Sequence, residues 1–594
     1  MLLICEEERN DMIKIENLSY SFPQKDLYNN ISFTLEDGQH CALIGTSGTG
    51  KSTLIDMIMN PNQYLFDGKI EIAPNCRIGY VSQFSSLEKS KEVTVFDYIG
   101  EKFIKLQQEI HALCTEMGTS TELEALLEKY QVALDAFHAI DGDNFESNIT
   151  KKLNLANLNN YENQLVTNLS GGELKLIQVI KEMLTAPELM IMDEPDVFLD
   201  FERLNSLKDL INSHKGIMLV ITHNRYLLNH CFNKIIHLED KELQEFDGSY
   251  TDYNFSLLEK KIDLQEQAIA EQEEIERNKK ILDKLRDDAT IHTCAAKGRS
   301  VHARVSILKR LEANKIKAPF VDIKQPNIQL QTNHPLENVD DLLELDHYSV
   351  SFDELLLNNV SFELKANEKV AIIGANGTGK TTLLRDIYKN NCEAIHLHED
   401  AKIAFLSQLQ GEMLNESNTI LDEFREVYDH PFEEVKEYLS NYGFEEEVLT
   451  QKIESLSGGE KNLLQLAKIS TSNANLLLLD EPTSHLDTYS QASLEQAIRN
   501  YNGAVLMVSH DFYTVVNCVD YILLIEDKTV RKMSSRKFRK MIYANHFDKD
   551  YLELEQKKKE VETRIELALK KTDFELARQL LEQLEAVINM LSKQ

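Results

Sequence analysis

Long apolar runs are missing from this sequence of 594 residues. No stretch reaches the roughly 18 to 20 consecutive apolar residues that a membrane-spanning helix needs. A short apolar run at the start is followed by acids up to Arg9, so we expect no signal peptide, and Met12 could serve as an alternative start. The eight cysteines show neither pairing nor Cys-x-x-Cys spacing, which favours a reducing cytoplasm and no structural zinc.

Basic residues are scarce as well. The chain has 64 Lys and Arg against 98 Asp and Glu, a formal net charge of −34, so it is not suited to coat nucleic acid over its whole surface. Residues 289–320 depart from this pattern, because they hold seven basic residues and the single acid Glu312. The basic residues are Lys297, Arg299, Arg304, Lys309, Arg310, Lys315 and Lys317. Such a run is either a solvated helix face or a local contact for a polyanion.

A helical hairpin is predicted around this basic run. Apolar residues recur every three or four positions from Phe255 to Asp288 and again from Val301 to Lys315, which is typical of helices with one apolar face. Gly298 marks the turn between them. Two helices of unequal length around a turn form an antiparallel hairpin, and the basic run would cover its tip.

The hairpin separates two halves of the chain, and each half contains a glycine-rich phosphate-binding loop between an apolar strand and a helix. The strands are predicted at Cys41–Ile44 and Val370–Ile373. The first loop consists of Gly45, Thr46, Ser47, Gly48, Thr49, Gly50, Lys51, Ser52 and Thr53, and the second of Gly374, Ala375, Asn376, Gly377, Thr378, Gly379, Lys380, Thr381 and Thr382. Backbone N–H groups of such a loop surround phosphates, the lysine reaches the β/γ oxygens, and Ser52 or Thr381 ligates Mg²⁺.

A second apolar strand in each half ends in two acids. The segments are Leu189-Met-Ile-Met-Asp193-Glu194-Pro195 and Leu476-Leu-Leu-Leu-Asp480-Glu481-Pro482. The first carboxylate of each pair suits Mg²⁺, and the second can polarise an attacking water. His223 and His510 follow a further strand and come within reach of a γ-phosphate, and Gln83 and Gln408 follow the strand-like segments Ile78–Ser82 and Ile403–Ser407.

The spacing of these motifs indicates an insertion in the first half. Gly171, Glu194 and His223 recur 287 residues later as Gly458, Glu481 and His510, whereas the phosphate-binding loops are 329 residues apart. The first half therefore carries 42 more residues between the phosphate-binding loop and Gly171 than the second half carries before Gly458. They fall around Ile99–Asp143, a helical stretch of mixed charge that we expect to project as an arm.

These motifs, in this order, resemble the ABC ATPases, and the resemblance covers most of both halves. The family's signature is present as Leu169-Ser170-Gly171-Gly172-Glu173 and Leu456-Ser457-Gly458-Gly459-Glu460. In that family two cassettes enclose two ATP molecules head to tail, and each signature starts a helix whose N-terminal dipole meets the γ-phosphate held by the opposite cassette. The resemblance implies a fold with two ABC-type P-loop domains in tandem, of the α/β class.

The resemblance also implies two composite sites for ATP and Mg²⁺. The first combines Gly45–Ser52, Gln83, Asp193, Glu194 and His223 with the signature Ser457–Glu460; the second combines Gly374–Thr381, Gln408, Asp480, Glu481 and His510 with Ser170–Glu173. Both glutamates, both switch histidines and both glutamines are assigned to catalysis, and the glutamines join Ser52, Asp193, Thr381 and Asp480 as metal ligands. Phe22 and Phe352 either stack on adenine or are core aromatics.

Two cassettes on one chain, an arm in the first and a charged helical linker resemble the ABC-F branch. The segment Phe246-Asp-Gly-Ser-Tyr250-Thr-Asp-Tyr253 before the linker is also similar to that branch. ABC-F proteins are cytoplasmic ATPases that bind the ribosome at the tRNA exit site, with the linker toward the P-site tRNA and the peptidyl transferase centre and the arm near the L1 stalk. Some are housekeeping translation factors and others protect the ribosome from antibiotics. The divergent linker tip and first-cassette loops favour the resistance role.

The chain departs from the branch in the loop after each Glu-Pro pair, where Thr-Asn-His-Leu-Asp is usual. The first cassette has Asp196-Val-Phe-Leu-Asp200 and the second Thr483-Ser-His-Leu-Asp487. The residues around the switch histidines differ too, as Thr222-His-Asn224 and Ser509-His-Asp511. Both glutamates remain, so we expect two competent sites that need not be equal.

The tail from Tyr551 to Gln594 is predicted as a second helical hairpin that bends at Lys571-Thr-Asp573. It is either a coiled coil that stabilises the second cassette or a further ribosome contact. We expect domains at 12–254, with the arm at about 99–143, then the linker at 255–318, the second cassette at 340–545 and the tail hairpin at 549–594.

The resulting hypothesis is an ATP-gated ribosome-binding monomer that contacts rRNA and P-site tRNA, with Lys297, Arg299, Arg304, Lys309 and Arg310 as RNA contacts and no membrane or transmembrane subunit. A DNA-handling ATPase, suggested by the tail, and a transporter motor are the alternatives. A GTPase is disfavoured because no Asn-Lys-x-Asp motif is present.

Overall fold

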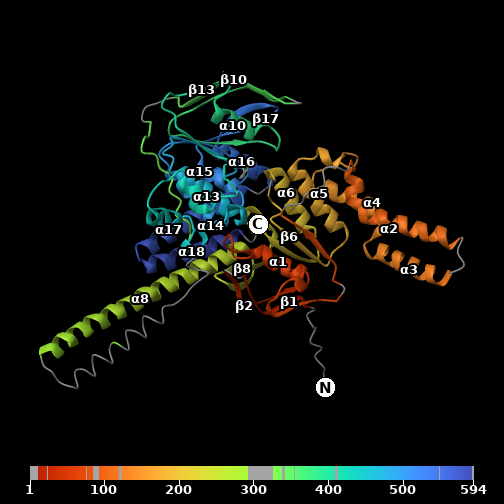
Figure 1. The fold of residues 1–594 in the computed structure, drawn as a ribbon, viewed down its shortest axis with the longest axis horizontal. Helices are drawn as coiled ribbons and strands as arrows, with labels where there is room; N and C mark the ends of the chain where they lie inside the picture. Colours follow the sequence, from red (N-terminus) through yellow and green to blue (C-terminus); the bar gives the residue numbers. More distant parts are fainter. Residues whose placement is uncertain are drawn as a thin grey trace. The chain divides into compact units, whose positions relative to one another are not determined.

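The computed structural model describes residues 11–22, 25–74, 76–83, 92–118, 123–197, 199–291, 305, 325–336, 341–352, 355–408, 413–546 and 549–591. These residues form two compact units (Figure 1). The first unit comprises Met1–Ser249 with Lys324–Lys540, and the second Tyr250–Ile323 with Met541–Gln594. The first unit contains both cassettes, and the second contains the linker and the tail.

The first cassette consists of two sheets with helices around them. Its strands are β1 (Asp11–Phe22), β2 (Lys25–Glu36), β3 (His40–Ile44), β4 (Asp67–Ile72), β5 (Ile78–Val81), β6 (Leu189–Asp193), β7 (Ile217–Ile221), β8 (Lys234–Glu239) and β9 (Glu242–Asp247). Its helices are α1 (Lys51–Met59), α2 (Val95–Met117), α3 (Leu123–Ala139), α4 (Phe145–Leu155), α5 (Gly171–Leu184), α6 (Phe201–Asn212) and α7 (Arg225–Cys231). Short 3-10 turns lie at Pro61–Gln63, Gly142–Asn144 and Val166–Asn168.

The second cassette repeats this plan without the long helical insertion. Its strands are β10 (Leu343–Ser351), β11 (Leu355–Leu364), β12 (Lys369–Ile373), β13 (Ile395–Leu397), β14 (Ile403–Leu406), β15 (Leu476–Asp480), β16 (Ala504–Val508), β17 (Tyr521–Glu526) and β18 (Thr529–Ser534). Its helices are α10 (Lys380–Lys389), α11 (Ile420–Arg425), α12 (Phe432–Ser440), α13 (Gly458–Ser470), α14 (Thr488–Asn500), α15 (Phe512–Cys518) and α16 (Ser535–His546).

The central sheet of each cassette brings the motif-bearing strand ends to one edge. The strand orders are β5-β6-β7-β3-β8-β9 and β14-β15-β16-β12-β17-β18, and all neighbours are parallel except the last pair of each sheet. The strands β6, β7, β15 and β16 are buried along their whole length. This explains their unbroken apolar sequences, because a parallel strand covered on both faces has no solvent side.

A second, antiparallel sheet of three strands packs beside each central sheet, in the orders β2-β1-β4 and β11-β10-β13. Apolar side chains from both sheets and from α1 or α10 form one core per cassette. Leu43 and Leu54 are examples in the first core, and Ile372 and Leu383 in the second. Each phosphate-binding loop therefore connects two elements that are fixed by the same core.

The arm is formed by α2 and α3, which pack side by side and project from the first cassette, in orange in Figure 1. The root of α2 is buried through Ile99 and Phe103, and the Phe103 ring stacks on Phe145 of α4 with centroids 5.1 Å apart. Leu126 and Phe137 of α3 are also buried. The helices lie where the insertion was predicted, although α2 begins four residues before Ile99.

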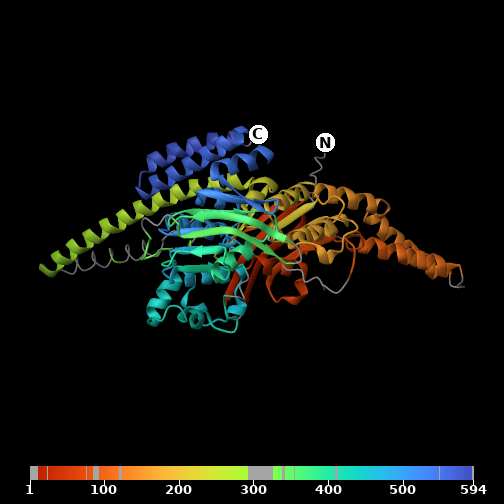
Figure 2. The same ribbon diagram turned by 90° about the horizontal axis from the view of Figure 1, so that it is seen from above.

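The second unit contains the linker helix α8 (Tyr250–Ile291) and the tail helices α17 (Lys549–Lys570) and α18 (Phe574–Leu591). The tail helices pack on each other and on α8, side by side in Figure 2. Ile262 of α8 is enclosed by residues such as Ile565 and Leu584. Arg578 adds ion pairs to Asp263 at 2.9 Å and Glu266 at 2.7 Å. The tail hairpin thus packs on the linker helix, a partner that the sequence did not reveal.

The predicted fold class is confirmed, including the α/β cassettes in tandem. The helix predicted from Phe255 begins five residues earlier, at Tyr250, because Tyr250 and Tyr253 are buried and join the helix. The second linker helix, predicted at Val301–Lys315, lies outside the described residues except for Val305. None of the helices in the described ranges combines the length and the apolar character that crossing a membrane requires.

Candidate active sites

The phosphate-binding loops run from the end of β3 to α1 and from the end of β12 to α10, as predicted. Gly45, Gly48 and Gly50 have φ angles of 151°, 78° and 98°, a region that L side chains avoid. A Cβ on Gly45 would lie 2.1 Å from the carbonyl oxygen of Leu238. The loop therefore passes against β8 at a distance that only glycine permits.

The loop lysines are buried and turn back into their own loops. Lys51 Nζ donates hydrogen bonds of 2.9 and 2.8 Å to the carbonyls of Gly45 and Thr46, and Lys380 makes the same pair of contacts at 2.8 Å. Burial lowers the pKa of both lysines, although neighbouring carboxylates oppose it. A bound triphosphate would supply the anionic partner that such a cation requires.

A hydroxyl meets a carboxylate beside each loop. Ser52 hydrogen bonds to Asp193, and Thr381 Oγ1 donates to Asp480 Oδ1 at 3.2 Å. Asp193 Oδ1 is buried without a hydrogen-bond partner, and burial raises the pKa of Asp193 to about 6. Such oxygens suit a hard divalent cation. Within the described residues no group of three or more His, Cys, Asp or Glu could hold a metal, so Mg²⁺ would share these oxygens with phosphate and water.

Glu194 and Glu481 occupy the same unusual backbone position in the two cassettes. Their φ angles are 44° and 50°, which a residue other than glycine adopts rarely and at a cost in strain. The backbone N–H of Glu194 donates to Ile221 O and that of Glu481 to Val508 O, both at 2.9 Å. The next strand of the sheet therefore fixes the turn that presents each glutamate.

The side chain of Glu194 is held by residues from both cassettes. Gln83 Nε2 donates to Glu194 Oε2 at 2.6 Å, and His485 Nδ1 of the second cassette lies 3.1 Å from the same oxygen. Burial alone would raise the pKa of Glu194, but the hydrogen bond from His485 and the nearby His223 and Lys51 lower it on balance. Glu194 is therefore kept ionised, as a general base must be.

The equivalent glutamate of the second cassette lies in a different environment. Glu481 Oε2 accepts from the backbone N–H of His510 at 3.2 Å, and Glu481 Oε1 is 3.6 Å from the ring Nε2 of the same residue. Burial, reinforced by Asp480, raises the pKa of Glu481 far above its usual range. Burial lowers the pKa of His510 to about 3 and that of His223 to about 4.

Each signature forms a capped helix start. Ser170 and Glu173 make a reciprocal capping box at the start of α5, and Ser457 and Glu460 do so for α13. Glu173 also accepts from Arg203 at 2.9 Å. The remaining N–H groups at such a helix start are available for an anion.

The two cassettes meet so that loops and signatures of opposite halves face each other. A Cβ on Gly459 of the second signature would lie 2.6 Å from Ser47 Oγ of the first loop. Ser47 N donates to Asp487 at 3.1 Å, and Asn376 N donates to Asp200 at 3.3 Å. Each phosphate-binding loop thus donates a backbone N–H to an aspartate of the opposite cassette.

A cavity of about 470 Å³ lies at the second site. Its walls combine the signature residues Ser170, Gly171 and Gly172 of one cassette with Asn376, Gly377, Lys380, Thr381, Thr382, Gln408, Asp480, Glu481 and His510 of the other. Every class of residue expected at this site is therefore present around one space.

Two sets of expected contact residues are not part of these sites: the aromatic residues expected near adenine and the basic residues expected to contact RNA. Phe22 and Phe352 are 45% and 70% exposed, so neither is a core aromatic, and their stacking on adenine remains a prediction. The five expected RNA contacts at 297, 299, 304, 309 and 310 lie outside the described residues.

Sequence reasoning missed four contact residues. Asp200 and Asp487 reach the opposite loops, His485 reaches Glu194, and Glu239 accepts from Thr46 N at 3.0 Å. The unequal loops 196–200 and 483–487 were the only signal for the first three. Nothing in the sequence marked Glu239.

The sequence profile described as "ABC transporter" matches residues 28–197 and 357–484, and a second profile of the same description matches residues 236–330. An uncharacterized ABC transporter ATP-binding protein of Bacillus subtilis, YfmM, is 28% identical over 84% of this chain and 96% of its own length. ABC transporter F family member 5 of Arabidopsis thaliana is 28% identical over 87% of this chain and 75% of its own length.

A solved structure has the same fold. It is the complex of archaeal ribosomal stalk protein aP1 and archaeal ribosome recycling factor aABCE1. The TM-score is 0.51 at 16% identity, and the match covers 89% of this chain and 92% of the other. The two cassettes, their composite sites and these matches define an ATP-binding cassette ATPase with both cassettes on one chain. Within that class the chain belongs to the ABC-F family.

Proposed function

We propose that this ATPase binds the ribosome in its ATP-bound form and releases it after hydrolysis. It would dock at the tRNA exit site, direct the linker hairpin toward the P-site tRNA and the peptidyl transferase centre, and protect the ribosome from antibiotics bound there. Mg²⁺ would accompany ATP, held by Ser52 with Asp193 and by Thr381 with Asp480. The protein would act as a monomer in the cytoplasm.

The linker carries this proposal. Helix α8 has 42 residues and spans roughly 60 Å at 1.5 Å per residue. The sequence beyond it holds seven basic residues against one acid, in a chain of net charge −34. A long helix that ends in a confined basic segment suits a phosphate backbone at one position, with affinity that falls as salt rises.

Two structural neighbours support the choice of partner. One fold neighbour is described as a ribosome recycling factor bound to a ribosomal stalk protein, and another as ABCE1 bound to the ribosome with Pelota, at a TM-score of 0.50. The F-family relatives align with 87% of this chain. The partner of this chain is therefore sought first among ribosomes.

Ribosome binding is tested with a variant that binds ATP without hydrolysing it. We expect Glu194→Gln combined with Glu481→Gln to co-sediment with ribosomes through a sucrose cushion in the presence of ATP, because closed cassettes would persist. Omission of ATP is the control and should leave the protein in the supernatant. Failure to co-sediment with ATP would refute the proposal.

The role of the basic segment is tested separately. Reversal of Lys297, Arg299 and Arg304 to Glu should weaken ribosome binding and reduce the dependence of binding on salt, since each phosphate contact contributes to that slope.

The matched control reverses the same number of charges elsewhere on the linker. Lys260, Arg277 and Lys280 lie on exposed positions of α8, and their change to Glu should leave the salt dependence as it is. Equal losses in the two triple variants would show that net charge, and not the basic segment, controls binding.

A housekeeping role in translation is the alternative within the same family. Growth of cells that express the protein, with and without drugs of the peptidyl transferase class, separates the two. Unchanged drug tolerance would leave the translation-factor role. The tail gives little support to DNA handling, because its apolar stripe is buried against α8.

A further inference from the structure

Two short helices that follow the switch histidines meet across the cassettes. Helix α7 begins after His223 and is capped by Asn224, whose side chain accepts from the backbone of Tyr226 at 3.0 Å. Helix α15 begins after His510 and is capped by Asp511 in the same way. Any movement of either switch loop therefore moves the first turn of the helix behind it.

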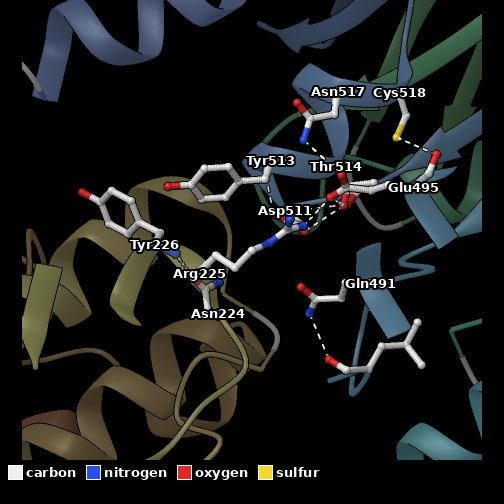
Figure 3. Close-up of polar contacts among 12 residues, drawn as sticks. Asn224, Arg225, Tyr226, Gln491, Glu495, Asp511, Tyr513, Thr514, Asn517 and Cys518 are labelled. Carbon is white, nitrogen blue, oxygen red and sulfur yellow. Dashed lines mark hydrogen bonds and ion pairs between the residues drawn. The ribbon is translucent and has the colours of Figure 1, made fainter. Parts of the chain in front are cut away.

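Arg225, in the first turn of α7, reaches from the first cassette into the second (Figure 3). Its Nη2 donates to Glu495 Oε1 and, at 3.1 Å, to Asp511 Oδ2. Its guanidinium also lies 5.1 Å from the centre of the Tyr513 ring. One side chain of the first cassette thus contacts α14 and the cap of α15 in the second.

The two acids are themselves held in place. Thr514 Oγ1 donates to Asp511 Oδ2 at 2.8 Å and to Glu495 Oε1 at 3.2 Å, and Asn517 donates to Glu495 Oε2 at 3.0 Å. These contacts are visible around the two carboxylates in Figure 3. Arg225 therefore contacts two carboxylates that are also held by side chains of their own cassette.

The cluster is largely removed from water. The side chains of Arg225, Glu495 and Asp511 are 19%, 9% and 16% exposed. Burial works against the charge of Arg225, but Asp511 and Glu495 outweigh it and raise its pKa above the ordinary value. Removal of one partner would leave a buried charge uncompensated, which is costly, so the three side chains depend on one another while the cassettes are closed.

The equivalent contact on the other side cannot form. At the 287-residue offset between the halves, Arg225 corresponds to Phe512, Asp511 to Asn224 and Glu495 to Lys208. The second cassette thus has no arginine at position 512, and the first has no acid at positions 208 and 224. The bridge is therefore one-sided, and it links one switch loop of each ATP site.

We propose that Arg225 is a positioning residue that couples the two ATP sites, by tying the His223 loop of one cassette to the His510 loop of the other. It would act through the two switch loops, because its guanidinium is held by Glu495 and by Asp511, the cap of α15. A change at one site, such as loss of the γ-phosphate, moves one capped helix and so pulls on the other. This inference depends on the ATPase activity alone and holds whether or not the protein binds ribosomes.

Coupling is measured as the effect of one site on the turnover of the whole enzyme. The turnovers of the Glu481→Gln and Glu194→Gln variants are added and divided by that of their parent, in three parents: the native protein, Arg225→Met and Glu495→Gln. In the absence of coupling the two sites simply add, so this ratio is one in every parent. We expect the ratio to shift by about fivefold or more when the bridge is removed, the lower end of ordinary coupling between sites.

Two further variants separate coupling from a loss of structure. The exchanged pair Arg225→Glu with Glu495→Arg should return the ratio toward the native value. Lys468→Met is the matched control, because it breaks the buried pair of Lys468 with Glu423 inside one cassette and should leave the ratio unchanged. Thermal unfolding of each variant shows which of them are folded, and Glu495→Gln preserves the shape of the site if Arg225→Met does not fold.

The result is decisive in both directions. A shifted ratio in Arg225→Met and Glu495→Gln, with a Hill coefficient for ATP that falls toward one, supports the coupling role. The same ratio in all three parents, or an equal shift in Lys468→Met, would overturn it.

Discussion

Replacement of His485 by Ala tests whether the second cassette positions the glutamate of the first. His485 Nδ1 lies 3.1 Å from Glu194 Oε2, and the two side chains are 12% and 16% exposed. Since the same position of the first cassette holds Phe198 in the sequence, the second glutamate has no corresponding histidine. The change should therefore affect the first site far more than the second.

The magnitude follows from one hydrogen bond to a charged group. Such a bond contributes about 1.5–3 kcal/mol, and each ~1.4 kcal/mol lost from transition-state stabilisation slows a reaction tenfold. Gln83 keeps its 2.6 Å contact with Glu194 in the variant, so part of the positioning remains. We expect turnover at the first site to fall by roughly 10- to 100-fold.

The assay uses backgrounds in which one site is inactivated. In a Glu481→Gln background, phosphate release reports the first site, and His485→Ala should lower it by the amount above. In a Glu194→Gln background, the same substitution should change turnover by no more than about twofold, because the contact it removes is already altered. His485→Gln, which can still donate, should recover part of the loss.

Equal effects in the two backgrounds would refute this reasoning, since they would show that His485 supports the interface in general. No effect in the Glu481→Gln background would show that Gln83 alone positions Glu194.

Two further predictions concern proton binding and the tail. The glutamate at either site must be deprotonated to act as a base. Burial and Asp480 raise the pKa of Glu481, whereas the pKa of Glu194 is lowered on balance. Turnover of the Glu194→Gln variant, which reports the second site, should therefore rise as pH increases above neutral, and turnover of Glu481→Gln should stay flat; identical pH–rate profiles would contradict this. Leu584→Ala should lower the free energy of unfolding of the second unit by about 2–5 kcal/mol, because Leu584 is fully buried, as measured by urea denaturation. Exposed Leu576 is the matched control, and its change to Ala should cost within about 0.5 kcal/mol.

Much of the fold could be predicted because its signals are local. The apolar strand before Asp193 is unbroken because both faces of β6 are buried, and the glycines at 45, 48 and 50 mark a loop that needs positive φ. The motifs appear twice in the same order, so the sequence also shows which motifs belong to the same cassette. These signals need no knowledge of how the halves meet.

The rest depends on contacts between residues far apart in the chain. His485 and Arg225 each act on the opposite cassette, and only the docking of the two surfaces decides what they touch. The tail showed a regular apolar stripe, but the sequence could not say that Ile262 of the linker helix would cover it. Helix periodicity gives the face that is buried, and not the partner that buries it.

The one-sided bridge of Arg225 makes the two halves of the chain non-interchangeable. In a protein built from two copies of the first half, Arg225 would face Lys208 and Asn224. In one built from two copies of the second half, Glu495 and Asp511 would face Phe512. The two halves of this single polypeptide therefore differ as the two subunits of a heterodimer do, and unlike charges join them at this point.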